Sequence, residues 1–125
     1  MRVTGDLRAR IVAQLADEES QKIIATVLDK PKTTREIAGD VTLPSTTLYR
    51  KISELRDCGL IIIDSFDFRS DGKREARYTC GFKEIIFKSN SGVLELDIVP
   101  SSKGLEKKWF EMFYSTTNGR SPEKS

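Results

Sequence analysis

Histidine is absent from this sequence of 125 residues, and cysteine is nearly so, with only Cys58 and Cys80. Without histidine, a Ser or Cys nucleophile has no histidine base, and the usual zinc sites lack a ligand. Two thiols are too few for a structural zinc site or a disulfide framework. We therefore predict no metal and no cofactor, and we expect both thiols to be small core residues. A redox response of one thiol is the alternative.

Glycine-rich loops and long apolar runs are missing as well. The eight glycines form neither a phosphate loop nor a dinucleotide fingerprint. The carboxylates are scattered, without a shared apolar setting that would shift their pKa values. These absences predict that the protein is not an enzyme. No apolar run approaches the roughly 18 residues of a membrane span, and no signal peptide is evident. We expect a cytoplasmic protein that does not bind membranes.

Charge of one sign is also scarce. The chain has 21 Lys and Arg against 19 Asp and Glu, which gives a net charge of +2 and a pI near 8.6. This is a weak argument for nucleic acid, so any DNA binding must come from local clusters of basic residues. The length and the 38% hydrophobic content fit one soluble globular domain.

The chain is organised around residues 33–60, TTREIAGDVTLPSTTLYRKISELRDCGL. Thr33 followed three residues later by Glu36 forms a capping box, which predicts a short helix. Pro44 suits the first turn of a second helix, predicted over residues 44–58, and Gly59 suits its end. Leu48, Ile52 and Leu55 recur at helical spacing in this second helix. The spacing therefore predicts two helices joined by a tight turn, with one stripe of the second facing a core.

The opposite face of the second helix carries hydroxyl, tyrosine and basic side chains. They are Ser45, Thr46, Thr47, Tyr49 and Arg50, with Lys51 flanking. Short hydroxyls and a tyrosine near a helix N-terminus are suited to base edges, and Arg and Lys to phosphates. We predict that this helix reads DNA in the major groove. The alternative is an ordinary solvated face.

After Gly59 the apolar pattern changes to alternation, which predicts a hairpin. Residues 60–68 and 74–82 form the two strands, and Ser70-Asp71-Gly72 forms the turn. Four basic residues near the tip outnumber the acidic ones by two, and these are Arg69, Lys73, Arg74 and Arg77. A basic hairpin beside a reading helix reaches phosphates or a minor groove. The alternative is a solvated tip.

The two ends of the chain predict further helices. Residues 5–29 form one bent helix or two, and residues 84–99 form a second hairpin. A last helix over 102–114 carries a cluster of apolar and aromatic side chains. It packs on its own core or meets a second copy of the chain. For a dimer, the predicted interface is Leu7, Ile11, Leu105, Trp109, Met112 and Phe113. The tail, residues 115–125, is expected to be disordered.

This order of elements resembles the winged helix-turn-helix transcriptional regulators, and among them the ArsR-like regulators common in archaea. The resemblance is carried by the TTREIAGDVTLPSTTLYRKISELRDCGLI run and the hairpin to Phe82, roughly residues 18–82. It implies an α+β fold over residues 1–114, with the helix-turn-helix at about 33–59 and the wing at about 60–82. It also implies a homodimer on a pseudopalindromic operator. Metal-sensing members carry a cysteine pair within the recognition region, or His and Asp ligands at the dimer helices. Here the recognition helix has only Cys58 and the chain has no histidine, so metal sensing is not expected.

Together these features predict a homodimeric regulator that binds double-stranded DNA. The alternative is a winged-helix module that binds a protein within a larger assembly, because the same scaffold serves both purposes. The hydroxyl, tyrosine and basic face favours DNA. The modest net charge and the aromatic last helix favour a protein partner.

Overall fold

The computed structural model describes residues 1–107, which form five helices and six strands, and the strands pair antiparallel in two three-stranded sheets. In chain order the elements are β1 (Arg2–Val3), α1 (Gly5–Leu15), α2 (Glu18–Thr26), β2 (Lys32–Thr33), α3 (Thr34–Asp40), α4 (Ser45–Asp57), β3 (Ile61–Phe68), β4 (Arg74–Cys80), β5 (Phe82–Asn90), β6 (Val93–Pro100) and α5 (Ser102–Glu106). The arrangement is an α+β fold with a helix-turn-helix followed by a wing, as predicted.

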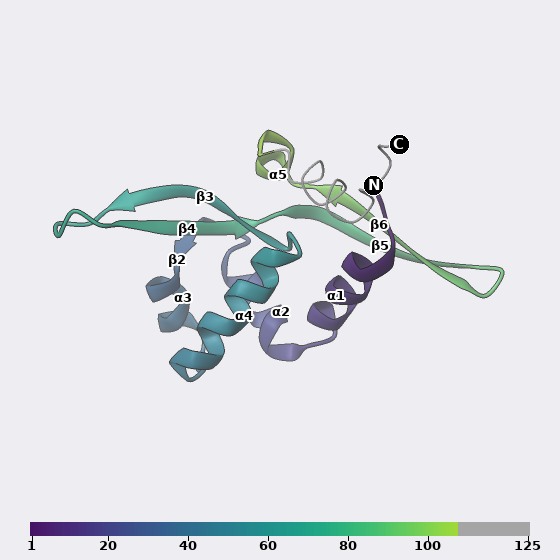
Figure 1. The fold of residues 1–125 in the computed structure, drawn as a ribbon, viewed down its shortest axis with the longest axis horizontal. Coiled ribbons are helices and arrows are strands. Elements are labelled where there is room, and N and C mark those ends of the chain that lie inside the picture. The colour runs from purple at the N-terminus through teal and green to yellow at the C-terminus, as the bar shows by residue number, and fades with distance from the viewer. Residues whose placement is uncertain (108–125) are drawn as a thin grey trace.

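The strands form two sheets that meet end to end. One sheet has the order β2-β4-β3 and the other has the order β1-β6-β5. Figure 1 shows helices α1 to α4 on one side of the strands and α5 on the other. The wing, β3–β4, and the second hairpin, β5–β6, extend from the helices in opposite directions (Figure 1). The wing therefore lies beside α3, and the second hairpin lies beside α1.

Local side-chain and backbone contacts begin and end the two helices of the helix-turn-helix. The Thr33 hydroxyl accepts a hydrogen bond from the Glu36 amide at 3.2 Å, and the Glu36 carboxylate accepts one from the Thr33 amide at 3.1 Å. This capping box starts α3, as predicted. Pro44 is the extended residue immediately before α4 rather than part of its first turn. Gly59 follows α4 with a φ of +80°, a conformation that suits glycine.

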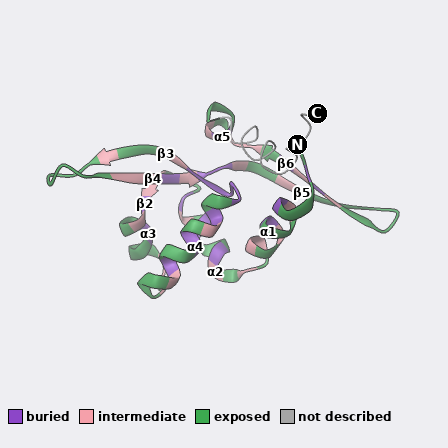
Figure 2. Ribbon diagram, viewed as in Figure 1, coloured by how far each residue is buried: buried purple, intermediate pink, exposed green. Residues whose placement is uncertain are grey.

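The core lies between the helices and the two sheets, as the buried segments in Figure 2 show. Helix α4 contributes Leu48, Ile52 and Leu55, the predicted stripe. Cys58 and Cys80 are both buried, as expected. Burial raises the pKa of the Cys58 thiol to about 11. It also raises the pKa of the Cys80 thiol. Both thiols are therefore protonated and weakly reactive at neutral pH, which argues against a redox role.

The structure corrects several boundaries. Of the two alternatives for residues 5–29, the chain forms two helices, because Asp17 caps α2 through the Ser20 amide and separates it from α1. Helix α2 ends at Thr26 rather than at about residue 29. The short strands β1 and β2 were not predicted, because each is only two residues long. The second strand of the wing, β4, ends at Cys80 rather than at Phe82, because β5 begins at Phe82.

The predicted dimer interface is wrong for the first helix. Leu7 and Ile11 are 3% and 0% exposed, because they pack in the core of their own chain. From the C-terminal helix, only α5 is described, and its Leu105 is 54% exposed. Trp109, Met112, Phe113 and the predicted tail lie outside the described residues. Within residues 1–107, every helix is too short or too polar to cross a membrane.

Candidate nucleic-acid interface

The exposed face of α4 begins at its N-terminus. Ser45, Thr46, Tyr49 and Arg50 are exposed, and Thr47 is half-buried. Tyr49 keeps 63% of its surface accessible. The face points outward because the apolar stripe of the same helix is fixed in the core. The structure thus places these five predicted DNA contacts on the first turns of one helix.

Arg50 lies on this face and is only loosely engaged. One guanidinium nitrogen, Nη1, is 3.4 Å from Oε2 of Glu54, one helical turn along α4. Both side chains are about half exposed, so the pair contributes little to stability. The Arg50 guanidinium is therefore free to exchange this carboxylate for a phosphate.

Lys51 is the one predicted contact on α4 that the structure contradicts. It is 7% exposed, and its ammonium lies 2.7 Å from Oδ2 of Asp17 and 3.8 Å from Oε1 of Glu19. The Asp17 carboxylate also accepts hydrogen bonds from Ser20. Lys51 thus fastens α4 to α2 and does not face a ligand. Its position three residues after Leu48 places it beside the buried stripe, a signal present in the sequence.

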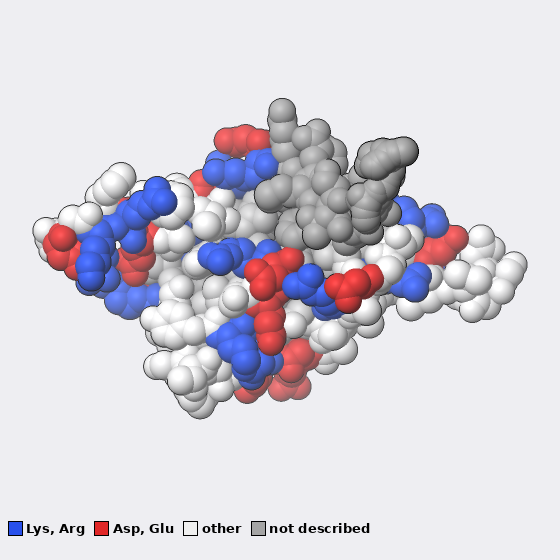
Figure 3. Space-filling view, in the orientation of Figure 1, with Lys and Arg blue, Asp and Glu red and all other residues white. Residues whose placement is uncertain are grey.

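The wing presents its basic residues at a tight turn. The Arg69 amide donates to the Lys73 carbonyl at 2.7 Å, and Gly72 supplies a φ of +84° at the turn. Arg69, Lys73 and Arg74 are exposed, and the Arg74 guanidinium sits over the Phe66 ring at 4.2 Å. Within the described part of the chain, the Lys73 ammonium makes no ion pair. Figure 3 shows basic side chains along the wing with acidic ones between them.

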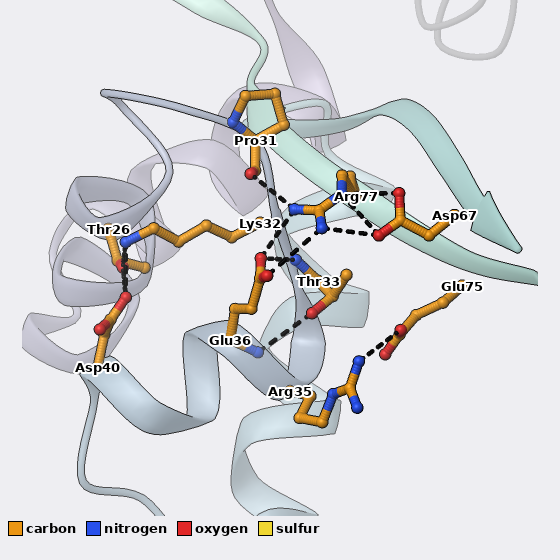
Figure 4. A network of polar contacts seen from close by, with 10 residues as sticks. All are labelled: Thr26, Pro31, Lys32, Thr33, Arg35, Glu36, Asp40, Asp67, Glu75 and Arg77. Atoms are coloured by element: carbon orange, nitrogen blue, oxygen red, sulfur yellow. Dashed lines mark hydrogen bonds and ion pairs between the residues drawn. The ribbon is translucent and has the colours of Figure 1, made fainter. Parts of the chain in front are cut away.

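Arg77, also predicted to contact DNA, is occupied inside the protein. Its Nε donates to both carboxylate oxygens of Asp67 at 2.9 Å, and its Nη1 donates to Oε1 of Glu36 at 2.8 Å and to the Pro31 carbonyl at 3.3 Å. Figure 4 shows the guanidinium between the wing and α3. The bonds to Asp67 and Glu36 raise the pKa of Arg77. Arg77 thus joins the wing to the helix-turn-helix and is not available to a phosphate.

The carboxylates that pair with Arg77 have lowered pKa values. The hydrogen bond from Arg77 lowers the pKa of Asp67. The pKa of Glu36 is lowered first by the Thr33 amide and then by Arg77. Both groups therefore stay ionised at neutral pH, and the network holds its full charge. Acidification through their lowered pKa values would weaken the join between the wing and α3.

We expect Arg77→Ala to loosen the wing without removing a phosphate contact. The wing would keep its ladder of strand hydrogen bonds but lose its link to Glu36. Hydrogen exchange of the amides in β3 and β4 should speed up, while the exchange of α1 and α2 amides stays unchanged. An unchanged exchange rate in the wing would contradict the assigned role.

A groove joins the face of α4 to the wing. It has a volume of about 300 Å³ and lies between α3, the first turns of α4 and the wing. Its lining residues are Thr34, Arg35, Ala38, Ser45, Leu48, Tyr49, Arg69 and Glu75. Arg35 and Glu75 form an ion pair of 3.0 Å across it. Sequence reasoning missed Arg35, although its place two residues before the buried Ile37 put it on the outer face of α3.

A second hollow, of about 570 Å³, lies between α2 and the turn from α3 to α4. Its charged residues already have partners. Lys22 pairs with Glu18 at 3.8 Å, and Asp40 pairs with Lys32 at 2.6 Å. Asp40 also accepts a hydrogen bond from the Thr26 hydroxyl (Figure 4). The contacts of Asp40 with Thr26 and Lys32 join α3 to α2, so these residues have a structural role. Among residues 1–107 no three His, Cys, Asp or Glu side chains gather as metal ligands would.

The sequence matches none of the protein families or curated proteins with which it was compared. Among solved structures, HlyU from Vibrio cholerae N16961 is similar to this chain, with a TM-score of 0.41 and 14% sequence identity. The similarity covers 89% of this chain and 91% of HlyU. At this identity, function has to be argued from the side chains described above.

Proposed function

We propose that this chain is a DNA-binding transcriptional regulator. One observation carries the proposal: the hydroxyl and tyrosine face of α4 and the basic tip of the wing flank a single groove. A helix in the major groove would place the wing on the adjacent backbone or minor groove. The net charge of +2 does not oppose this, because the cations that matter are local.

The residues divide into two roles. Ser45, Thr46, Thr47 and Tyr49 would read base edges, because they carry short donors and acceptors at the exposed start of α4. Phosphates would be held by Arg50 on α4 and by Lys73, Arg74 and Arg69 at the wing tip. Lys51 and Arg77 are excluded from both roles by their ion pairs inside the protein.

We further infer that the regulator is a homodimer of the ArsR-like type. A second copy would read the other half of a pseudopalindromic site. Apolar side chains left exposed on the second hairpin support self-association, and these are Phe87, Val93 and Leu94. Leu105 on α5 is exposed as well. The proposal thus moves the interface from α1, whose apolar face is buried, to the second hairpin and the C-terminal end.

Four single substitutions test the DNA contacts. Arg50→Ala and Lys73→Ala should each weaken binding to every duplex sequence and reduce the slope of log affinity against log salt by about 1. Tyr49→Phe and Thr46→Ala should instead cost about 1–3 kcal/mol of discrimination at the preferred site, with an unchanged salt slope. Fluorescence anisotropy titrations at several salt concentrations measure both quantities.

Lys22→Ala is the matched control, because Lys22 is an exposed lysine on α2, outside both the proposed DNA contacts and the proposed dimer interface. Its affinity and salt slope should equal those of the unchanged protein. If Arg50→Ala and Lys73→Ala behaved like this control, α4 and the wing would not be the DNA contacts.

A protein-binding module is the second candidate, and one feature favours it. On the wing, Phe66 and Phe68 share the face opposite to Asp67 and Arg77, which point to α3. Phe68 is 81% exposed and Phe66 is 39% exposed. Such an aromatic face suits a protein partner. Binding through it would resist salt, whereas DNA binding would weaken steeply as salt rises.

A further inference from the structure

The ion pair between Arg35 and Glu75 spans the groove that joins α4 to the wing. Arg35 comes from α3 and Glu75 from β4, and Nη2 of the arginine lies 3.0 Å from Oε1 of the glutamate. The two side chains differ in their surroundings, since that of Arg35 is 74% exposed and that of Glu75 only 18%. The arginine therefore projects into solvent, whereas the glutamate is largely covered by the protein, and Figure 4 shows the pair between α3 and the wing.

The groove around this pair is rich in groups that bind an anion. Thr34 and Ser45 supply hydroxyls, Tyr49 supplies a phenol, and Arg69 supplies a second guanidinium at the wing tip. Arg69 is half exposed and pairs at 3.3 Å with Asp71, which is also exposed. A planar guanidinium can bind two oxygens of a phosphate at once. Glu75 is the only carboxylate among the residues that line the groove.

We propose that this groove seats one backbone phosphate of duplex DNA and that Glu75 competes with it for Arg35. The inference rests on the proposed function, because it assigns a contact within that DNA complex. On binding, the Arg35 guanidinium leaves Glu75 and turns to the phosphate. Glu75 thereby loses its ion-pair partner, and the cost of breaking this pair weakens binding to every sequence alike.

The energetics favour exchange at Arg35 and not at Arg77. The pair with Glu75 is exposed on the arginine side, and such pairs are cheap to break. Arg77 is joined to two carboxylates and one backbone carbonyl, so its guanidinium has no freedom to turn. Arg35 makes one ion pair within residues 1–107, and it lies on the rim of the groove. It is thus the guanidinium of α3 that can switch partners.

Three variants of the full chain test the proposal with a random-sequence duplex. Glu75→Gln should tighten binding by about threefold to fivefold, since it removes the competing charge but keeps the shape of the side chain. Arg35→Ala should weaken binding and lower the salt slope by about 1, as expected for one lost phosphate contact. In the double variant, Glu75→Gln should lose most of its effect, because the residue it frees is gone.

The control for a general change of charge is Glu95→Gln. Glu95 is 23% exposed and pairs with Arg2 at 3.2 Å, so its setting is close to that of Glu75, but it lies on the other sheet. Its removal should leave affinity nearly unchanged. Thermal unfolding of each variant confirms that the compared proteins are folded.

The outcomes separate this inference from the proposed function. Tighter binding by Glu75→Gln that depends on Arg35 supports the phosphate seat. If the unchanged protein binds the duplex but Glu75→Gln equals Glu95→Gln, or its effect simply adds to that of Arg35→Ala, the inference is wrong and the proposed function stands. If the unchanged protein does not bind the duplex at low salt, both are wrong.

Discussion

Gly81→Ala is expected to destabilise the protein by about 2–3 kcal/mol or more, the cost of forcing an extra methyl group into a packed site. Gly81 separates β4 from β5, where the chain passes close to the end of α4. A Cβ atom at this position would collide with the carbonyl oxygen of Gly59 and would lie 3.2 Å from Cγ2 of Ile62. The Gly59 backbone cannot easily move away, because its positive φ of +80° is part of the turn that follows α4.

The same site is held by two backbone hydrogen bonds. The Gly81 amide donates to the Leu60 carbonyl at 3.0 Å, and its carbonyl accepts from the Ser101 amide at 3.1 Å. Relief of the collision would therefore strain the junction of both sheets with α5. Chemical denaturation followed by circular dichroism measures the loss.

Gly39→Ala is the matched control for the glycine substitution. Gly39 lies within α3, and no atom would lie within 4 Å of an added Cβ. Alanine is the better helix former, so this variant should gain about 0.5–1 kcal/mol. Equal effects of the two substitutions would contradict the close packing at Gly81.

Asp17→Ala is expected to cost about 2–3 kcal/mol, because it removes a helix cap and the partner of a buried ammonium together. The carboxylate accepts hydrogen bonds from the Ser20 amide at 2.8 Å and from the Lys51 ammonium at 2.7 Å. The Lys51 side chain is 9% exposed, and without Asp17 its nearest acid is Glu19 at 3.8 Å. Because the Asp17 side chain is 37% exposed, solvent screens part of the pair, and the expected cost stays moderate.

Two variants separate the cap from the charge. Asp17→Asn keeps an oxygen that can accept from Ser20, so it should lose less stability than Asp17→Ala. Asp6→Ala removes an exposed carboxylate whose pair with Arg10 is 3.8 Å long, and it should change the free energy of unfolding very little. A loss of the same size in Asp6→Ala would show that general charge, and not this cluster, is responsible.

The pH dependence of stability has a definite sign at Asp17. The hydrogen bond from Lys51, followed by those from Ser20, lowers the pKa of Asp17 from 3.8 to about 2. A carboxyl whose pKa is lower in the folded state stabilises the fold above its unfolded pKa. This contribution is complete above about pH 4 and is lost as the pH falls toward 2. Asp17→Asn should therefore flatten the acid limb of the stability curve.

The local elements were predictable because their signals lie within a few residues of one another. The capping box of Thr33 and Glu36, the stripe of Leu48, Ile52 and Leu55, and Gly59 each depend on neighbours in the same element. The structure confirms them and the wing. The positions of Ser45, Thr46, Tyr49 and Arg50 on one exposed face follow from the same helical spacing.

The errors concern partners that are distant along the chain. Lys51 meets Asp17 34 positions away, and Arg77 meets Glu36 41 positions away. A basic residue near a wing or a reading helix has the same sequence signature whether it faces DNA or a carboxylate. The prediction that Leu7 and Ile11 lie in a dimer interface was wrong for a related reason. An apolar stripe on a helix does not reveal whether the core of its own chain or a second copy covers it.

The central claim is best tested by titrating the purified protein with a random-sequence duplex at about 50 and 200 mM salt, with sedimentation of the same samples. The account predicts a dimer that binds at micromolar concentration or below at the lower salt and weakens by about ten-fold or more at the higher salt, as expected for several phosphate contacts. Absence of binding at the lower salt, or binding that does not change with salt, would contradict it.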